Sequence, residues 1–203
     1  MMLLKSKNYN PKTTEIAFFG GSFTAIEKGY MLSLLDAGYE EVNSGRVSGI
    51  RVSTRPDAIN ETIIKRALSY HMTAIELGVQ STNDYILKKC KRGHTFEDVK
   101  RASKLIRRFG FTLGHQMMVG LSESTRLDVL NTAKDLAKLK PKMIRIYPVL
   151  VIRNTELEEE YKKGEYEPVS LTGAVEVCKE LYYFFEKKKI KVIRIGLQNT
   201  DLI

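Results

Sequence analysis

The sequence has few cysteines, no tryptophan and no long apolar run. Only Cys90 and Cys178 occur among 203 residues, far apart and outside any C-x-x-C pair, so they predict neither a disulfide framework nor a metal cluster. No window approaches the roughly 18 apolar residues of a membrane span, and the first 15 residues have no hydrophobic stretch long enough for a signal peptide. These absences favour a cytoplasmic protein with no membrane partner.

Several catalytic and nucleotide-binding motifs are also missing. Neither G-x-G-x-x-G nor G-K-[ST] occurs, which excludes a dinucleotide fingerprint and a P-loop. No Ser-His-Asp or paired-carboxylate pattern converges on His94 or His115, so the sequence does not favour either as an acid–base catalyst. No linker or low-complexity stretch divides the chain, and we expect one domain over residues 1–203.

Positive charge is abundant. The net charge is +9 with 43% hydrophobic residues, enough apolar material for one sizeable core. Basic segments such as "KLIRRFG" and "FFEKKKIKVIR" attract phosphates, including those of RNA. Lys-rich helices are also commonly plain solvated faces, so both interpretations stay open at this point.

Hydrophobic periodicity predicts short strands that alternate with longer helices. The expected strands are Glu15 to Phe19, Ile50 to Thr54, Ala74 to Val79, Thr112 to Met118, Met143 to Val149 and Lys191 to Ile195. The expected helices are Glu27 to Glu41, Glu61 to Tyr70, Phe96 to Phe109, Arg126 to Leu139 and Leu171 to Lys188. Thr95 and Asp98 suit the start of the third helix as a capping box, and residues 152–170 form the longest irregular segment, a candidate lid or substrate loop.

Polar residues alternate with apolar ones inside these strands. In "IRVSTRPD", Ile50 and Val52 share one face while Arg51 and Ser53 share the other, and "AIELGVQS", "MIRIYP" and "KVIRIGLQ" repeat the pattern. A doubly wound sheet buried on both faces has near-continuous apolar strands, so a barrel or partial barrel with a polar interior fits better. The interior charges either pair with one another or bind a ligand.

Polar and glycine residues follow the strands where barrel enzymes place their working groups. These strand ends are Gly20-Gly21-Ser22, Arg55-Pro56-Asp57, Gln80-Ser81, Gly120-Leu121-Ser122, Tyr147-Pro148 and Gly196-Leu197-Gln198. A glycine pair at such an end lets a ligand approach the backbone closely, although an ordinary turn also uses one. Arg92, beside Gly93 and ahead of a helix, suits a carboxylate or phosphate.

The blocks "EIAFFGGSFT", "IRVSTRPDAI", "AIELGVQSTNDYILKKCKRGHTFEDVKRASKLIRRFGF", "GHQMMVGLSEST", "IRIYPVLVIRNTELEEEY" and "VIRIGLQ" together resemble the radical S-adenosylmethionine (SAM) core. The similarity runs from about Glu15 to the end and points to the branch of the Elongator catalytic subunit and oxygen-independent coproporphyrinogen oxidase. It implies an α/β fold, a partial (β/α)6 TIM-like barrel that binds SAM and a [4Fe-4S] cluster. It also implies an electron donor such as ferredoxin or flavodoxin, and a tRNA or other RNA substrate is expected from the Elongator-like blocks.

The resemblance assigns residues to SAM. Gly20, Gly21 and Ser22 match the glycine-rich site whose backbone receives the methionyl amino group, and Arg92 matches an arginine that engages the methionyl carboxylate. Gln80 and Gln116 match polar positions near the ribose. The remaining expected cofactor residues lie at strand ends: Ser53, Arg55 and Gln198.

The sequence departs from the family at two places. The usual L-P-G reads Leu121-Ser122-Glu123, which puts that turn in question. The C-x3-C-x2-C cluster motif does not occur, and a cubane with three protein ligands needs three thiolates close together. We therefore expect an N-terminally truncated radical SAM protein that is inactive alone. The alternatives are a degenerate SAM or nucleoside-binding module and an unrelated barrel that binds a phosphate.

Overall fold

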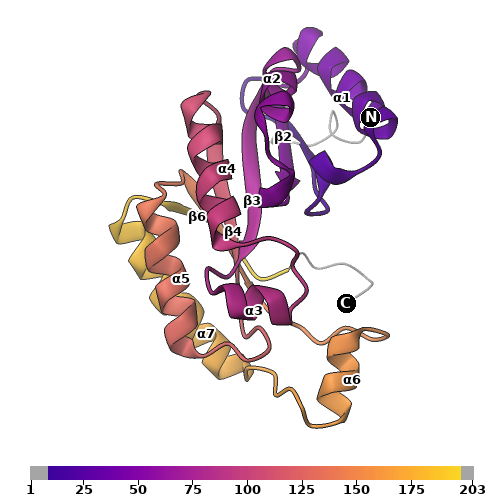
Figure 1. The fold of residues 1–203 in the computed structure, drawn as a ribbon. Helices are drawn as coiled ribbons and strands as arrows, with labels where there is room; N and C mark the ends of the chain where they lie inside the picture. The colour runs from indigo at the N-terminus through magenta and orange to yellow at the C-terminus, as the bar shows by residue number, and fades with distance from the viewer. Residues whose placement is uncertain (1–8, 198–203) are drawn as a thin grey trace. The chain divides into compact units, whose positions relative to one another are not determined.

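The computed structural model describes residues 9–197 and contains six strands with helices between them (Figure 1). The strands are β1 Glu15–Phe18, β2 Gly49–Thr54, β3 Met72–Gln80, β4 Thr112–Val119, β5 Met143–Pro148 and β6 Lys191–Ile195. The α-helices are α1 Lys28–Asn43, α2 Glu61–Ser69, α3 Asp84–Lys89, α4 Phe96–Arg108, α5 Arg126–Lys138, α6 Glu156–Lys162 and α7 Leu171–Lys187. All six expected strands and all five expected helices are confirmed, with ends that shift by at most a few residues.

Two short helices were not expected. α3 and α6 have six and seven residues, too few for a hydrophobic period to show. α6 lies inside residues 152–170, so the prediction that this segment is irregular throughout was wrong. Its start carries a T-x-x-E pattern, and the Thr155 side chain accepts a hydrogen bond from the Glu158 N–H. The expected cap of α4 is confirmed, because Asp98 N donates to Thr95 Oγ1 at 3.3 Å and Thr95 N donates to Asp98 Oδ2 at 2.9 Å.

The chain divides into two compact units. The first comprises the described residues up to Gly78 together with Arg101–Leu113, and the second comprises Val79–Lys100 and the described residues from Gly114 onward. β3, α4 and β4 therefore each contribute residues to both units. Strand order follows chain order, from β1 to β6. The expectation of a single domain over residues 1–203 stays a prediction.

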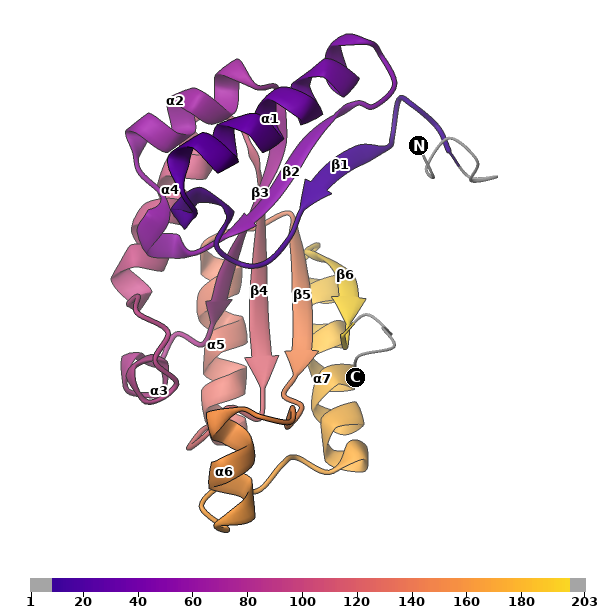
Figure 2. The same ribbon diagram turned by 90° about the vertical axis from the view of Figure 1, so that its right-hand side faces the viewer.

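In the first unit, β1, β2 and β3 pair in parallel, with Phe18 opposite Val52 and Val52 opposite Ile75. α1 and α2 cover one face of these strands (Figure 2). The helix α1 approaches closely at Gly38, where an added Cβ would lie 3.0 Å from Ile50 Cδ1. This close packing buries Ile50 and Val52 completely, on the strand face that the alternation predicts to be apolar.

In the second unit, β4, β5 and β6 pair in parallel, with Gly114 opposite Met143 and Met143 opposite Lys191. Figure 2 shows α5 and α7 on one face of these strands and α6 beyond the arrowheads of β4 and β5. The apolar face predicted for "KVIRIGLQ" is only partly covered, since Ile195 is 45% exposed. β6 is the last strand in the order and has one strand neighbour, which explains the exposure.

Candidate cofactor site

The Gly20-Gly21 turn follows β1 directly. Gly20 has φ +126° and Gly21 has φ +77°, conformations that L-residues rarely adopt. No described heavy atom lies within 4 Å of a Cβ placed on either glycine. The backbone conformation, rather than crowding from the protein, therefore requires glycine here, and the space beside the turn is open to a ligand.

Two contacts anchor this turn on its far side. The Phe23 ring, buried in the short 3-10 helix Phe23–Ala25, stacks on Phe18 with ring centroids 4.9 Å apart. Thr24 donates its N–H to Thr54 Oγ1 at 3.2 Å, and the two hydroxyl oxygens lie 2.6 Å apart. Because Thr54 ends β2, the turn after β1 is fixed to the carboxyl end of the neighbouring strand.

The two site residues predicted on β2 lie near the same end of that strand. Ser53 is 1% exposed, while Arg55 follows the last residue of the strand with 37% of its side chain exposed. Arg55 donates from Nε and Nη2 to the two carboxylate oxygens of Asp57, at 3.0 and 2.8 Å. The structure therefore brings Gly20, Gly21, Ser22, Ser53 and Arg55 to adjacent strand ends in the first unit, with Arg55 already bound to a carboxylate.

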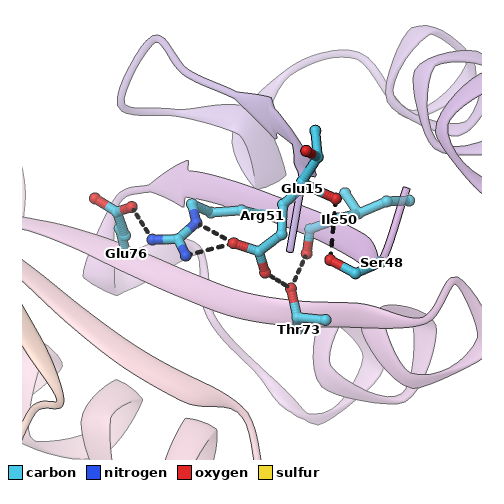
Figure 3. A network of polar contacts seen from close by, with 7 residues as sticks. Glu15, Ser48, Ile50, Arg51, Thr73 and Glu76 are labelled. Carbon is cyan, nitrogen blue, oxygen red and sulfur yellow. Dashed lines mark hydrogen bonds and ion pairs between the residues drawn. The ribbon is translucent and has the colours of Figure 1, made fainter. Parts of the chain in front are cut away.

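The charged residues on the polar face of β1, β2 and β3 form one network (Figure 3). Arg51 Nε donates to Glu15 Oε2 at 3.0 Å, and Arg51 Nη1 donates to Glu76 Oε1 at 3.1 Å. The Thr73 hydroxyl donates to Glu15 Oε1. Burial lowers the pKa of Arg51, but its bonds to both carboxylates outweigh this effect and raise the pKa above the usual value. Of the two explanations for interior charges, mutual pairing therefore holds for these three residues.

Gln80, at the end of β3, is a predicted site residue whose buried side chain has an unsatisfied acceptor. It is 7% exposed with φ +70°, and its Oε1 accepts no hydrogen bond from residues 9–197. Ser81 N donates to Val79 O at 2.9 Å, which fixes the chain on both sides of Gln80. A buried amide oxygen without a donor costs free energy, so its position indicates a partner other than the described residues.

The remaining predicted residues of the second unit lie in the loop before α4 and in β4. Arg92 follows α3, and its backbone N–H donates to Leu87 O at 2.9 Å. The buried His94 lies 3.1 Å from Val79 O through Nε2, which ties this loop to the end of β3 beside Gln80. Gln116 is 7% exposed in β4. Gln198 lies outside the described residues.

His115, in β4, is fully buried, and burial lowers the pKa of its imidazole to about 3. The ring is therefore neutral at physiological pH and does not exchange protons with solvent there. This geometry agrees with the sequence analysis, which does not favour His115 as a catalytic acid or base. His94, through its contact with Val79 O, has a positional role instead.

A cavity of about 360 Å³ opens beyond the ends of β4 and β5 in the second unit. Its floor is apolar, with Met118, Leu121 and Leu150 among the lining residues, and its basic side includes Lys89 and Arg92. Lys91 of the loop after α3 and Glu156 of α6, which also line the cavity, form an ion pair. Sequence patterns did not single out this cavity as a whole, because part of its wall comes from the two short helices, α3 and α6, that were not predicted.

Cys90 also lines this cavity, and burial raises the pKa of its thiol. Of the two cysteines, Cys178 is 5% exposed, whereas Cys90 is half-buried. A raised thiol pKa lowers the thiolate fraction at neutral pH, so Cys90 has little of the reactive form.

Leu121-Ser122-Glu123, which stands where the family usually has L-P-G, still forms a turn. Ser124 N donates to Leu121 O at 2.9 Å, and Glu123 occupies the left-handed region with φ +61°. Glutamate therefore takes at this position a conformation that glycine adopts without strain. Gly120, just before it, has φ +85° and its carbonyl accepts a hydrogen bond from Tyr166 at 2.7 Å.

Comparison with known families gives an independent assignment of the chain. Residues 2–136 match the family model described as the radical SAM superfamily, and residues 141–203 match the Radical_SAM C-terminal domain. The first match alone covers more than half of the sequence. The chain belongs to the radical SAM superfamily.

Curated relatives are considerably longer. The tRNA uridine(34) acetyltransferase of Methanocaldococcus jannaschii is 37% identical over 140 residues, which cover 68% of this chain and 26% of the relative. That of Methanocaldococcus infernus is 34% identical over 183 residues, 80% of this chain and 34% of the relative. Human Elongator complex protein 3 is 29% identical over 196 residues, covering 86% and 36%. The chain thus spans about a quarter to a third of these proteins.

Solved structures confirm the fold class. Methanocaldococcus infernus Elp3 with an N-terminal deletion (1–46) has a TM-score of 0.79 and 28% identity, covering 95% of this chain and 52% of that chain. Escherichia coli coproporphyrinogen III oxidase (HemN) has a TM-score of 0.66 at 16% identity, covering 86% and 40%. The fold is the α/β partial TIM-like barrel of radical SAM proteins, as the sequence predicts.

The two cofactors of this superfamily fit the chain differently. For SAM, the open glycine turn and the unsatisfied Gln80 Oε1 offer the backbone and acceptor groups that an amino acid and a ribose require. A [4Fe-4S] cluster with three protein ligands needs three thiolates, and this sequence has two cysteines, Cys90 and Cys178. Within residues 9–197, no group of three His, Cys, Asp or Glu side chains is placed to hold a metal.

No helix of the described range has the length and apolar character to cross a membrane.

Proposed function

We propose that this chain is the SAM-binding core of a radical SAM enzyme that modifies tRNA. The observation that carries the proposal is the buried Gln80 Oε1, an acceptor that residues 9–197 leave without a donor. A ribose hydroxyl of SAM is a donor of the right kind. In this superfamily, SAM together with a reduced cluster supplies the radical that abstracts a substrate hydrogen.

The chain's own residues would bind and orient SAM. Gly20, Gly21 and Ser22 would present backbone groups to the methionyl amine, because the two glycines have no side chain and the space beside them is open. Arg92 would engage the methionyl carboxylate with its guanidinium fork. The other residues of the proposed site are the polar side chains Ser53, Arg55, Gln116 and Gln198.

The RNA substrate class is supported by the relatives. Two archaeal relatives named tRNA uridine(34) acetyltransferase share 37% and 34% identity with this chain. The net charge of +9 suits a polyanionic substrate. A one-electron donor such as ferredoxin or flavodoxin is part of the same proposal, as is a cytoplasmic location.

The cysteine content favours a second candidate function. With two cysteines, this chain cannot by itself hold a three-thiolate cluster, so it would act alone as a SAM- or nucleoside-binding module without redox chemistry. Both candidates share the SAM site and differ in whether cluster ligands are supplied from outside this chain.

Calorimetric titration with SAM and with S-adenosylhomocysteine tests the shared site. We expect binding by the unmodified chain and a roughly tenfold or larger loss of affinity in Gln80→Leu, which removes the amide but keeps the volume. A second variant, Gly21→Ala, tests the glycine turn. Its matched control is Gly110→Ala, because Gly110 is another left-handed glycine with open space around it, and this control should leave SAM affinity unchanged. Absence of binding by the unmodified chain would refute both candidates.

Anaerobic reconstitution with iron and sulfide then tests the second candidate and the expected inactivity of the isolated chain. We expect no iron–sulfur charge-transfer absorbance and no 5′-deoxyadenosine from this chain alone. Appreciable 5′-deoxyadenosine would contradict the second candidate and the expectation that the isolated chain is inactive.

A further inference from the structure

A basic groove runs along the outside of the first unit, between the carboxyl half of α4 and the start of α2. Its cavity volume is about 370 Å³. Arg101, Lys104 and Arg108 of α4 form one side, and Ile59 and Asn60 lie across from them. All these residues belong to the first unit, and none belongs to the proposed SAM site.

The three cations share one face of α4. Their spacing of three and four residues places them in a row over two helical turns, a length of roughly 10 Å. Lys104 and Arg108 are exposed, and neither forms an ion pair with any residue of the described range. On the same helix, by contrast, Lys100 is paired with Glu97. Within the described residues, Lys104 and Arg108 thus present two positive charges without an ion-pair partner.

The rest of the lining does little to cancel this charge. Glu61 is the one carboxylate among the described residues that line the groove, against three cations. Asn60 caps α2, and its Oδ1 accepts a hydrogen bond from Ile63 N at 3.0 Å, so its amide donors stay available to a ligand. Leu105, which is partly exposed, contributes apolar surface. The groove therefore offers several donors and a net positive charge to an elongated anion.

We propose that this groove binds the phosphate backbone of an RNA. A row of cations over roughly 10 Å matches a line of phosphates better than a single phosphate, since nucleic acids carry closely spaced negative charges along their length. The concave form disfavours a lipid bilayer, whose flat surface contacts convex faces. The choice of RNA rests on the proposed function, and the inference adds which surface holds the substrate's backbone.

The salt dependence of RNA binding tests the groove. Fluorescence anisotropy with a labelled tRNA transcript, between about 50 and 200 mM salt, gives the slope of log affinity against log salt. We expect Lys104→Gln with Arg108→Gln to reduce the magnitude of this slope by about 2, and to weaken binding roughly 10- to 50-fold at 0.1 M salt. The charge-conserving pair Lys104→Arg with Arg108→Lys should keep the slope.

A matched control removes the same amount of charge elsewhere. Lys134→Gln with Lys179→Gln neutralises two exposed lysines on α5 and α7 of the second unit, and should leave the slope unchanged. Equal losses in both double variants would overturn the proposal, because net charge alone would then explain binding. An unchanged slope in the groove variant, or no RNA binding by the unmodified chain at 50 mM salt, would also overturn it.

Two further measurements separate this inference from its alternatives. If the groove variant loses binding to anionic phosphatidylserine vesicles while its RNA slope is unchanged, the groove is a lipid site and the proposal fails. SAM titration of the groove variant should match that of the unmodified chain. If the groove variant loses the RNA slope but the unmodified chain does not bind SAM, the proposal for the groove stands and the proposed function is refuted.

Discussion

The two units satisfy their buried polar groups in different ways. On the polar face of the first unit, Arg51 is held between Glu15 and Glu76, so the charges there are paired within the protein. In the second unit, the buried amide of Gln80 has an oxygen that accepts no hydrogen bond from residues 9–197. A buried charge without a partner is strongly destabilising. A buried neutral amide without a partner costs less free energy. The charges of Arg51, Glu15 and Glu76 are therefore satisfied within the first unit, whereas the Gln80 amide of the second unit keeps an acceptor that residues 9–197 do not use.

The turns that follow the strands show a related contrast. After β1, Gly20 and Gly21 adopt left-handed conformations with open space beside them. After β4, a glutamate, Glu123, occupies the left-handed region. The first turn is unstrained and accessible, while the second carries the strain of a side chain in an unfavourable conformation. Four predictions test these differences, from the largest expected effect to the smallest.

Breaking the network of the first unit should cost the most. Arg51→Met leaves the buried Glu76 and the half-buried Glu15 without their cation, so the free energy of unfolding should fall by about 3 kcal/mol. Urea denaturation measures the change. Arg46→Met, which removes an exposed pair with Glu41, is the control and should cause no measurable loss. A loss below about 1 kcal/mol in Arg51→Met would contradict the view that this face depends on internal pairing.

Lowering the pH should destabilise the second unit through His115. Its folded-state pKa of about 3 lies below the unfolded value of 6.5, so the unfolded chain binds the extra proton. The stability from the neutral ring is complete above pH 6.5 and is lost as the pH falls towards 3, at about 1.4 kcal/mol per pH unit. Between pH 7 and pH 5, His115→Gln should therefore lose about 2 kcal/mol less than the unmodified chain. Parallel pH profiles for the two proteins would show that His115 is not buried as described.

The glycine turn should be sensitive to a single methyl group. Gly21→Ala forces a side chain into a left-handed conformation at φ +77° and should lower the free energy of unfolding by about 1–2 kcal/mol. Gly110→Ala, at φ +84°, should lose a similar amount. Thermal unfolding compares the two. If both variants lose equal stability but only Gly21→Ala loses SAM affinity, the turn at Gly21 faces the ligand and the turn at Gly110 does not. Equal SAM affinities in the two variants would contradict this difference.

The strained turn of the second unit should respond in the opposite direction. Glu123→Gly relieves the left-handed conformation and should raise the free energy of unfolding by up to about 1 kcal/mol. The variant also removes the exposed contacts of Glu123 with Tyr85 and Lys89, which should offset little of the gain. Differential scanning calorimetry would detect the rise in melting temperature. A fall instead would mean that these exposed contacts outweigh the backbone strain.

Much of the fold could be predicted because its signals are local. Strands such as residues 191–195 and helices such as residues 171–187 are long enough for a period of two or 3.6 residues to show. The glycine pair after β1 marked a backbone that needs positive φ, and Thr95 with Asp98 marked the start of α4. α3 and α6 escaped detection because six or seven residues carry no clear period, although T-x-x-E at Thr155 was a usable signal.

The sequence alone determined the order of strands and helices, the family, and the residue types at each strand end, since these depend on neighbours along the chain. Only the tertiary structure decided that Arg51 is shared by Glu15 and Glu76, residues 36 and 25 positions away. It likewise decided that Gln80 Oε1 finds no donor among residues 9–197 and that Lys104 and Arg108 line a groove with Asn60. Pairing, burial and the absence of a partner arise from strand register and helix packing, which bring together residues that no local pattern connects.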